Sequence, residues 1–208
     1  MREYLDAIIV AGLVALFLTT FVIRTFYIPS ISMIPTLQVG DMLLVNELDY
    51  HLHPPHDGDI AVFKPPIPAG GDEFIKRVIG VAGDTIRISK GIVYRNGLPL
   101  REPYENQPPN YNLRIADDTI YVDGEPLDPA TANIPPRAMW QSPDRIPPGF
   151  VFMLGDNRNY SEDSHVWGFA QLHGRFAAGP LAHSRTQASF AGRAIMIFWP
   201  FGRIHILR

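Results

Sequence analysis

Two serines close together are the residues of this chain best suited to nucleophilic chemistry. Ser30 and Ser32 lie in a segment that contains Pro29 and Pro35, and prolines restrict the backbone around them. In an extended segment, a spacing of two residues points both hydroxyls to one side. One hydroxyl could then attack a carbonyl, if a base activates it, while the other donates to the developing oxyanion. By local composition alone, a linker with two solvated serines is the simpler interpretation.

A serine nucleophile needs a base, and one of the three lysines has a suitable context. The chain contains Lys64, Lys76 and Lys90. The first precedes two prolines and the last lies in a Ser-Lys-Gly turn, so we expect both to be exposed. Strand alternation places Lys76 on one face with Phe74 and Val78, and Arg77 on the other face. Burial would lower the pKa of the Lys76 amine and make it a base. Alternatively, Lys76 reaches solvent from a strand edge or pairs with a carboxylate, and stays charged.

A polar segment, Leu154 to Gly168, could hold such a site together. It directly follows a run of apolar residues, which indicates a loop that leaves a core strand. Asp156 could pair with Arg77 and so fix the strand that carries the lysine. Ser161 could donate a hydrogen bond that orients the amine.

Two groups of residues could suggest a metal site, but neither has the spacing of one. Oxygen ligands occur together at Asp156, Asn157 and Asp163. They do not follow the EF-hand pattern and lack its terminal glutamate. Histidines and aspartates gather in a proline-rich loop at His51, His53, His56, Asp57 and Asp59. They fit no specific template for a metal site or a Ser-His-Asp triad, so we expect no metal.

One segment differs from the globular average. The run from Ala7 to Ile23 carries no charge over seventeen residues, and as a helix it would span roughly 26 Å. It lacks a small-x-small cleavage site at its end, so we expect a retained transmembrane anchor rather than a cleaved signal peptide. Arg2 favours a cytoplasmic N-terminus, and Arg24 is one opposing charge. A buried core helix is the alternative.

Beyond Tyr27 the sequence predicts short strands and few or no helices. The apolar runs are Met42–Val45, Ile60–Phe63, Phe74–Val81, Ile86–Ile88, Val151–Leu154 and Ile195–Trp199. Gly, Pro, Asn and Asp separate them at short intervals, which indicates a mainly antiparallel β protein. Two similar segments, Ile92–Leu100 and Thr119–Leu127, each contain an Asn-Gly or Asp-Gly pair and predict two hairpins.

Composition excludes several other classes of function. The net charge of −3 and the scattered basic residues argue against nucleic-acid binding. Cysteine is absent, which removes disulfides, thiolate catalysis and Cys-ligated zinc.

The stretch from Arg101 to Pro148 is rich in proline and polar residues, and we expect an elaboration without chemistry outside the main sheet. The stretch from Gln171 to Gln187 has no clear pattern.

Four blocks of the sequence resemble the bacterial type I signal peptidases, a serine-lysine protease family. They are Pro29–Leu37 with Gly40-Asp41, Gly58–Phe63, Ile75–Gly80 with Gly83-Asp84, and Gly155–Gly168. The blocks cover most of the chain outside the two irregular stretches. The resemblance implies that Ser32 is the nucleophile and Lys76 the base, with Ser30 and the Ser32 N–H as the oxyanion hole. It further implies that Ser161 positions the lysine and that Asp156 and Asp163 are structural acids.

The resemblance also implies a fold, a substrate class and a location. The fold would be an antiparallel β-rich catalytic core with an inserted smaller β domain, after one N-terminal transmembrane helix. We therefore expect an anchor and flank at 1–27, the core at 28–100 and 149–208, and the insertion at 101–148. The substrates would be secreted preproteins, cut after a small-x-small motif bound in shallow apolar S1 and S3 pockets, without a cofactor. The site would lie on the extracytoplasmic side of the bacterial cytoplasmic membrane, held by a single pass through the bilayer.

Three departures from the family pattern stand out. Ile31 replaces a residue that is commonly glycine, and His165 replaces the usual arginine, which weakens the expected pairing with Asp163 and could make that corner sensitive to pH. The Gln171–Gln187 stretch is also longer than usual.

Two other classes of function remain possible from the sequence. One is a membrane-anchored binding module. The other is a self-cleaving serine-lysine regulator, which would need a DNA-binding helical region where the apolar run lies.

Overall fold

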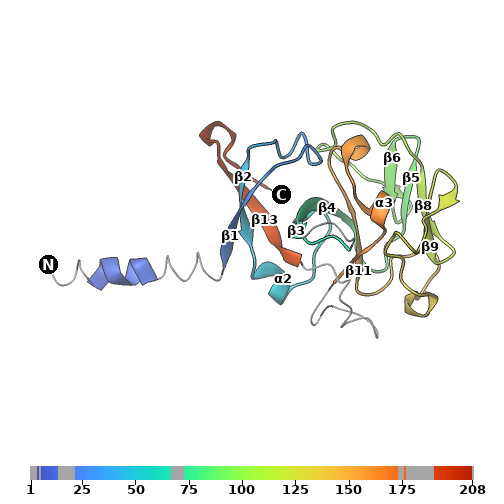
Figure 1. Ribbon diagram of the computed structural model, residues 1–208, viewed down its shortest axis with the longest axis horizontal. Coiled ribbons are helices and arrows are strands. Elements are labelled where there is room, and N and C mark those ends of the chain that lie inside the picture. The colour runs from blue at the N-terminus through green and yellow to red at the C-terminus, as the bar shows by residue number, and fades with distance from the viewer. Residues whose placement is uncertain are drawn as a thin grey trace.

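The fold consists of two antiparallel sheets, seen in a computed structural model that describes residues 4, 6–13, 22–66, 73–172, 176 and 190–207 (Figure 1). The eight-stranded sheet has the order β1-β2-β13-β3-β4-β11-β12, with β14 also paired to β13. Its strands are β1 (Ile23–Tyr27), β2 (Met42–Asn46), β3 (Ile60–Phe63), β4 (Phe74–Gly80), β11 (Phe150–Leu154), β12 (Ala170–Gln171), β13 (Phe190–Trp199) and β14 (His205–Ile206). The expected mainly β architecture is therefore confirmed.

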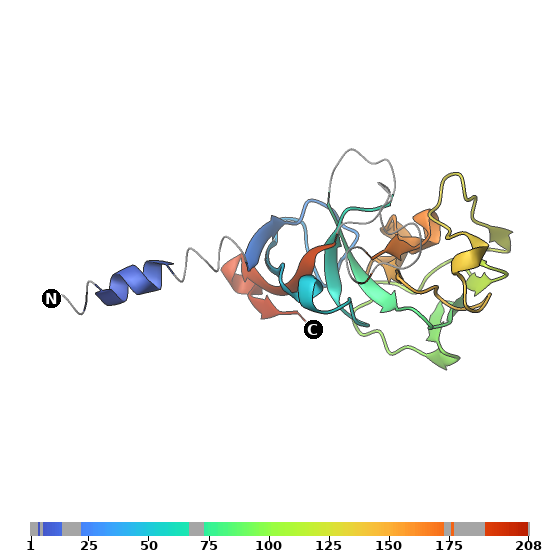
Figure 2. The same ribbon diagram turned by 90° about the horizontal axis from the view of Figure 1, so that it is seen from below.

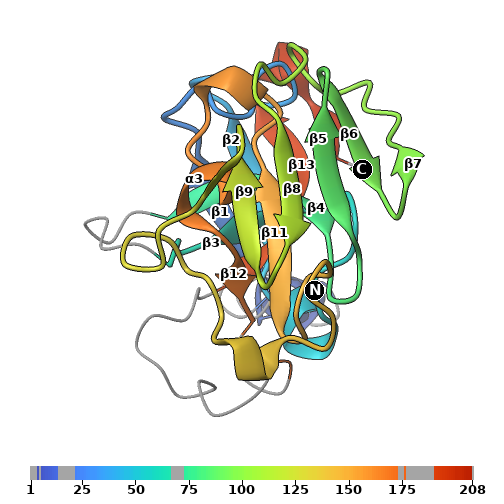
Figure 3. The same cartoon turned by 90° about the vertical axis from the view of Figure 1, so that its right-hand side faces the viewer.

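The six-stranded sheet forms one end of the β structure, as Figure 3 shows. Its order is β10-β9-β8-β5-β6-β7. Its strands are β5 (Ile86–Ser89), β6 (Ile92–Arg95), β7 (Leu98–Pro99), β8 (Leu113–Ala116), β9 (Thr119–Val122) and β10 (Glu125–Pro126). Apart from the helical residues at 6–13, the described helices are short: α2 (Asp49–Leu52), α3 (Ser164–Trp167), and the 3-10 helices η1 (Arg137–Met139), η2 (Arg158–Tyr160) and η5 (Phe201–Arg203).

Both hairpins that the sequence predicted are present. Asn96 and Gly97 connect β6 to β7 with φ angles of 53° and 79°. Asp123 and Gly124 connect β9 to β10 with φ angles of 50° and 94°. Positive φ at both central residues defines the tight turn that matches the twist of antiparallel strands, and Asn-Gly and Asp-Gly adopt it at low cost.

The smaller sheet begins earlier in the chain than the sequence predicted. Its first strand, β5, starts at Ile86, whereas the insertion was expected to start at residue 101. Strand β5 pairs with β6 on one side and with β8 on the other, so residues on both sides of position 101 belong to one sheet. The partner of a strand depends on residues distant in the sequence, which local hairpin signals do not report.

One hydrophobic cluster joins the two sheets. Ile88 and Leu113 of the smaller sheet, together with Phe150 and Phe152 of β11, belong to it. Phe169 lies at its centre with no exposed surface, and its ring packs edge-on against the rings of Trp140, Phe150 and Phe152. The sheets are therefore bound to each other by a shared core rather than by a hinge.

The N-terminal apolar run is described only in part. Residues 6–13 are helical, and residues 14–21 of the expected anchor lie outside the described residues. Ile23, which the sequence placed at the end of that anchor, instead begins β1 and pairs with Asn46. Figure 2 shows the helix at 6–13 in blue, near the N label. Across the described parts of the chain, no helix combines the length and apolarity needed to cross a bilayer. Most of the Gln171–Gln187 stretch also lies outside the described residues.

Replacing Phe169 by alanine tests the shared core. We expect Phe169→Ala to lower the free energy of unfolding by about 3 to 5 kcal/mol, because it removes a fully buried ring from the core that the two sheets share. Chemical denaturation followed by circular dichroism measures the change. Leu98→Ala is the control, since Leu98 is 71% exposed and should change stability by less than about 0.5 kcal/mol. A loss below about 1 kcal/mol for Phe169→Ala would contradict a continuous core.

Candidate active site

The segment that carries the two serines connects β1 to β2 and is fixed from both ends. Met33 and Leu37 are buried in the hydrophobic core, so the backbone beside Ser32 is anchored by packing. Asn157, from the loop after β11, donates its backbone N–H to the Ser32 carbonyl oxygen at 3.0 Å. Its side-chain amide donates to the Ile31 carbonyl oxygen, also at 3.0 Å. The fold therefore holds this segment by contacts on both sides.

Ser32 and Lys76 are hydrogen-bonded to each other. The Lys76 Nζ atom lies 2.9 Å from the Ser32 Oγ atom and 3.2 Å from the carbonyl oxygen of Ile75. The amine also lies 5.1 Å from the centre of the Phe74 ring, and Lys76 as a whole is only 4% exposed. Of the two alternatives that the sequence left open for Lys76, the structure has the buried one.

Burial makes this amine a much weaker base than an ordinary lysine. Desolvation of the charged form lowers the pKa of Lys76 from 10.5 to about 8, and the carboxylates of Asp163, Glu162 and Asp156 oppose that effect by raising it. Desolvation is the larger effect because none of these carboxylates forms an ion pair with the amine. Near pH 8 about half of the molecules therefore carry a neutral amine next to the Ser32 hydroxyl.

The Ser30 hydroxyl lies beside the dyad. Its Oγ atom is 3.3 Å from the Ser32 Oγ atom, so both hydroxyls point to the same side as expected. They open into a cleft of about 650 Å³ whose walls are mostly apolar. The apolar side chains are those of Phe26, Tyr27, Ile28, Ile31, Met33, Phe74 and Ile75. Two carboxylates, Glu73 and Glu162, also line this cleft. An extended apolar chain could bind here with a carbonyl group near both serines.

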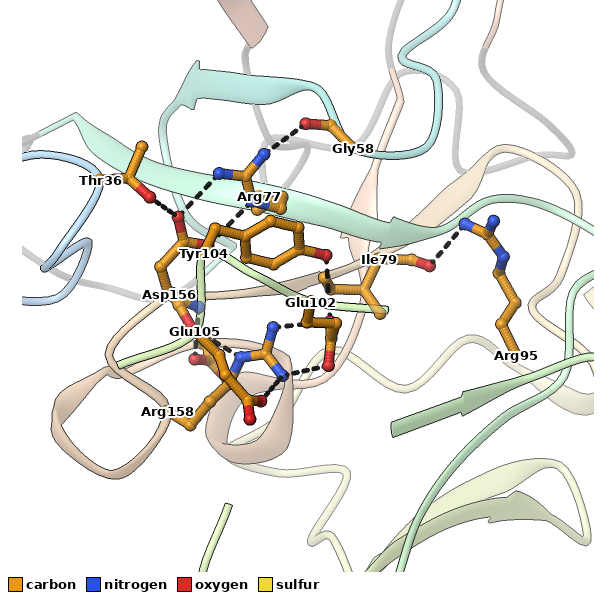
Figure 4. A network of polar contacts seen from close by, with 12 residues as sticks. Thr36, Gly58, Arg77, Ile79, Arg95, Glu102, Tyr104, Glu105, Asp156 and Arg158 are labelled. Carbon is orange, nitrogen blue, oxygen red and sulfur yellow. Dashed lines mark hydrogen bonds and ion pairs between the residues drawn. The ribbon is translucent and has the colours of Figure 1, made fainter. Parts of the chain in front are cut away.

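A buried ion pair fixes the strand that carries the lysine (Figure 4). Arg77 donates from Nε and Nη2 to the two carboxylate oxygens of Asp156, each at 2.8 Å, and from Nη1 to the Gly58 carbonyl oxygen at 2.9 Å. Thr36, which follows Ser32 in the chain, donates its hydroxyl to the same carboxylate. Asp156 thus joins β4 to the serine segment. The predicted pairing of Asp156 with Arg77 is present.

A second buried pair supports the loop after β11, and sequence analysis missed it. Arg158 has no exposed side-chain surface and makes two hydrogen bonds to the Glu102 carboxylate, at 2.9 and 2.8 Å (Figure 4). The ring of Tyr104 lies 3.8 Å from the Arg77 guanidinium carbon. Glu102 and Tyr104 belong to the stretch that was expected to carry no chemistry. The one sequence feature that could have indicated this pair is Arg158 in the loop after an apolar strand, because a loop arginine that becomes buried needs a carboxylate partner.

Ser161 does not make the hydrogen bond that the sequence predicted. Its hydroxyl is buried, and it has no hydrogen-bond partner among the described residues. The Lys76 amine is bonded to Ser32 and Ile75 instead. Ser161 nevertheless lies against the segment that carries Ser32, because a Cβ atom on Gly155 would overlap both its hydroxyl and the Ser32 carbonyl oxygen. Only a glycine at position 155 allows this close approach.

Asp163 is fully engaged by protein donors. One carboxylate oxygen accepts the Gly155 backbone N–H at 2.9 Å, and the other lies 2.6 Å from Nδ1 of His165. The His165 ring is stacked on Tyr111 with ring centres 4.4 Å apart. His165 therefore takes the pairing that an arginine would make in the family pattern. In the described part of the chain, no three histidine or acidic side chains are placed to hold a metal ion.

Comparison with known proteins gives a consistent result. Residues 1–199 match the family model described as "Signal peptidase, peptidase S26". The chain is 40% identical over 209 residues to "Probable signal peptidase I-1" of Synechocystis sp., which covers 98% of this chain and 85% of the relative. It is 35% identical to "Signal peptidase I" of Leptolyngbya laminosa, over 98% of this chain and 82% of the relative. It is 32% identical to "Signal peptidase I" of Bacillus caldolyticus, over 92% of this chain and 88% of the relative.

Replacing the buried lysine by an apolar residue of similar length should stabilise the protein at low pH. In the unfolded chain the Lys76 amine has its ordinary pKa of 10.5, and in the folded protein about 8, so the folded state is penalised whenever the amine is charged. We expect Lys76→Met to be more stable than the parent by about 3 kcal/mol below pH 8. The difference should shrink between pH 8 and 10.5, where the folded parent has already released its proton.

Denaturation curves of both proteins between pH 6 and 11 measure this difference. Lys64→Met removes an exposed lysine and controls for the loss of one positive charge. A stability difference between Lys76→Met and the parent that stays constant across this range would contradict a buried, partly neutral amine.

Proposed function

Because the chain belongs to the signal peptidase family, peptidase S26, and is thus a serine peptidase, we propose that it removes N-terminal signal peptides from secreted preproteins by a Ser32–Lys76 dyad. One observation carries this proposal: an amine only 4% exposed lies 2.9 Å from a serine hydroxyl. That arrangement supplies both requirements of a serine nucleophile, a base within hydrogen-bond reach and a pKa near the working pH.

In the first step the neutral Lys76 amine takes the proton of the Ser32 hydroxyl. The Ser32 oxygen then attacks the carbonyl carbon of the peptide bond, and the carbonyl oxygen becomes an oxyanion. The exposed Ser30 hydroxyl and the Ser32 backbone N–H are the donors we assign to that oxyanion. Two positioned donors matter here because hydrogen bonds that form only in the transition state lower the barrier directly.

In the second step the protonated Lys76 gives its proton to the leaving amine, and the mature protein departs. The signal peptide remains bound to Ser32 as an ester. Lys76, neutral again, takes a proton from a water molecule that attacks this ester. It then gives that proton to the Ser32 oxygen as the signal peptide leaves, so the serine hydroxyl is restored. The proton count closes, since the lysine starts and ends the cycle neutral. Its lowered pKa makes both directions of transfer possible near pH 8.

The cleft next to the dyad suits a substrate with small apolar residues before the cut. Its walls include Ile28 and Ile31 from the serine segment and Ile75 from β4, so an extended chain would contact apolar surface on both sides. Cleavage after a small-x-small motif is the specificity that we propose. Ile31, which replaces the usual glycine, is 47% exposed and lines this cleft, so its side chain adds to the apolar wall.

We further propose that the apolar run that begins at Ala7 and precedes β1 holds the enzyme at a membrane. In the described helix at 6–13, Ile8, Val10 and Leu13 are between 59% and 69% exposed, which water disfavours and a bilayer would cover. Strand β1 follows this run, and its last residues, Phe26 and Tyr27, line the cleft, so an anchored enzyme would keep its cleft near the bilayer. The location we propose is the extracytoplasmic side of the bacterial cytoplasmic membrane.

Removing either member of the dyad should abolish cleavage without unfolding the protein. We expect Ser32→Ala and Lys76→Met each to lower kcat by at least 10³-fold on a labelled preprotein, since nucleophile and base act as a unit. Mass spectrometry of the parent's products maps the cut, which should follow a small-x-small motif. Leu98→Ala serves as a folded control with full activity. Turnover by either dyad variant would reject the mechanism, and a membrane-anchored binding module would show no cleavage by the parent either.

The pH dependence of the reaction should follow the lysine. We expect kcat/KM to rise tenfold per pH unit below about pH 8 and to level off above it, because only the neutral amine accepts the serine proton. Glu162→Gln removes a carboxylate that raises the pKa of Lys76, so the rising limb should move to lower pH, most clearly at low salt. Glu125→Gln, a change of the same kind on β10, should leave the limb in place. An unchanged limb in Glu162→Gln would contradict this electrostatic role.

A further inference from the structure

A row of six side chains crosses the whole six-stranded sheet. The register pairs each residue with its neighbour on the next strand. In strand order the row is Pro126, Tyr121, Arg114, Arg87, Tyr94 and Pro99. It is symmetrical about the central pair of arginines, because two hairpins of the same kind flank it. We call this set the arginine row.

The arginine row lies on the outer face of the sheet. Ile88 and Leu113, which alternate with the two arginines along β5 and β8, are 1% and 2% exposed and belong to the core. Arg87 and Arg114 are exposed on the opposite face. Figure 3 shows this sheet at the near end of the molecule, in front of β4, β11 and β13. A partner could therefore reach both arginines.

Two like charges directly opposite each other on a sheet repel, and nothing in the described residues neutralises these two. Neither Arg87 nor Arg114 has a carboxylate within ion-pair distance among the residues that the structure describes, although most buried or half-buried arginines here have one. Directly opposed like charges destabilise a sheet. An anionic partner bound to both arginines would remove this repulsion.

Tyrosines hold the two guanidinium groups in place. Arg87 stacks on Tyr94 of β6 and Arg114 on Tyr121 of β9, each with its guanidinium carbon 4.3 Å from the ring centre. Stacking uses the face of a guanidinium group and leaves its N–H edge free to bind an oxyanion. Since β6 and β9 flank the central strands on opposite sides, the two groups lean apart. They suit two separate anionic groups better than one.

A hollow of about 330 Å³ lies at the centre of the arginine row and is lined by donors. Besides the arginines, its polar lining comes from Ser89, Asn112 and Tyr121, and no acidic residue lines it. Ser89 and Asn112 are the next residues on the same face of the sheet. Two acids in this corner already accept hydrogen bonds: Asp123 from the Asn112 backbone N–H at 2.8 Å, and Asp117 from the Tyr121 hydroxyl at 3.3 Å. The hollow therefore favours negative charge.

We propose that the arginine row binds an acidic polypeptide segment in extended conformation, with one carboxylate on each guanidinium group. The strands that carry the two tyrosines are three strand spacings apart, or about 14 Å, which extended carboxylate residues three or four positions apart can span. A bilayer is a poorer occupant, because β1, which follows the apolar run, lies at the other end of the β structure (Figure 1). Two charges are also few for a nucleic acid.

A binding measurement on the full-length protein in detergent micelles tests this proposal. The probe is a fluorescent Gly-Ser peptide with glutamates at positions i and i+4, and the matched peptide carries glutamines there. We expect fluorescence anisotropy to show binding of the first peptide only, weakening as salt rises. Arg87→Gln with Arg114→Gln should weaken it at least tenfold, and each single variant several-fold. Arg137→Gln, which removes a 90% exposed arginine elsewhere in this region, should change affinity less than twofold.

Several outcomes would overturn the proposal. Equal binding of the two peptides, or binding that the double variant retains, would show that the arginines are not the site. Inorganic phosphate that displaces the peptide as well as a free glutamate peptide does would indicate a single-oxyanion site. Binding to phosphatidylglycerol vesicles that depends on both arginines, without peptide binding, would assign the row to lipid. Circular dichroism checks that each variant is folded, and the test is independent of the Ser32–Lys76 reaction.

Discussion

The removal of one lysine amine from water is the constraint on which the rest of the site depends. Lys76 is 4% exposed, and its neutral form is favoured only because apolar neighbours exclude solvent. Keeping a charged amine there costs stability, so the surrounding fold must hold it. Strand β4 lies between β3 and β11, and backbone hydrogen bonds on both sides fix its position. The sheet therefore holds the amine beside Ser32, at the cleft that both residues line.

Two acidic residues near Lys76, Asp156 and Asp163, form their hydrogen bonds and ion pairs with other groups and not with the amine. Asp156 is bonded to Arg77 and Thr36, and Asp163 to the Gly155 N–H and His165. A free carboxylate against the amine would raise the pKa of Lys76 back toward its ordinary value and prevent the base role that we propose for it. Each carboxylate thus fixes the structure near the site, and its negative charge interacts with a partner other than Lys76. His165 serves this purpose where the family pattern has an arginine.

The smaller sheet contributes to the site although it carries neither serine nor lysine. The chain that leaves β7 supplies Glu102 and Tyr104, which contact Arg158 and Arg77. These contacts brace the loop after β11 and the strand that carries Lys76. The same sheet presents a separate, basic outer face with its two opposed arginines. One element can therefore support the cleft on one side and face a different partner on the other.

The sequence by itself determined what depends on local patterns. Short apolar runs predicted the strands, and Asn-Gly and Asp-Gly pairs predicted two hairpins, because alternation and turn chemistry act over a few residues. The strand context of Lys76 offered a buried amine as one of two alternatives. Tertiary structure decided the rest. It placed Ser32 beside Lys76 across 44 positions, gave β5 to the smaller sheet, left Ser161 without the expected bond and brought in Glu102 and Tyr104. These depend on which distant segments meet, and burial and pairing between distant segments are properties of the packed chain.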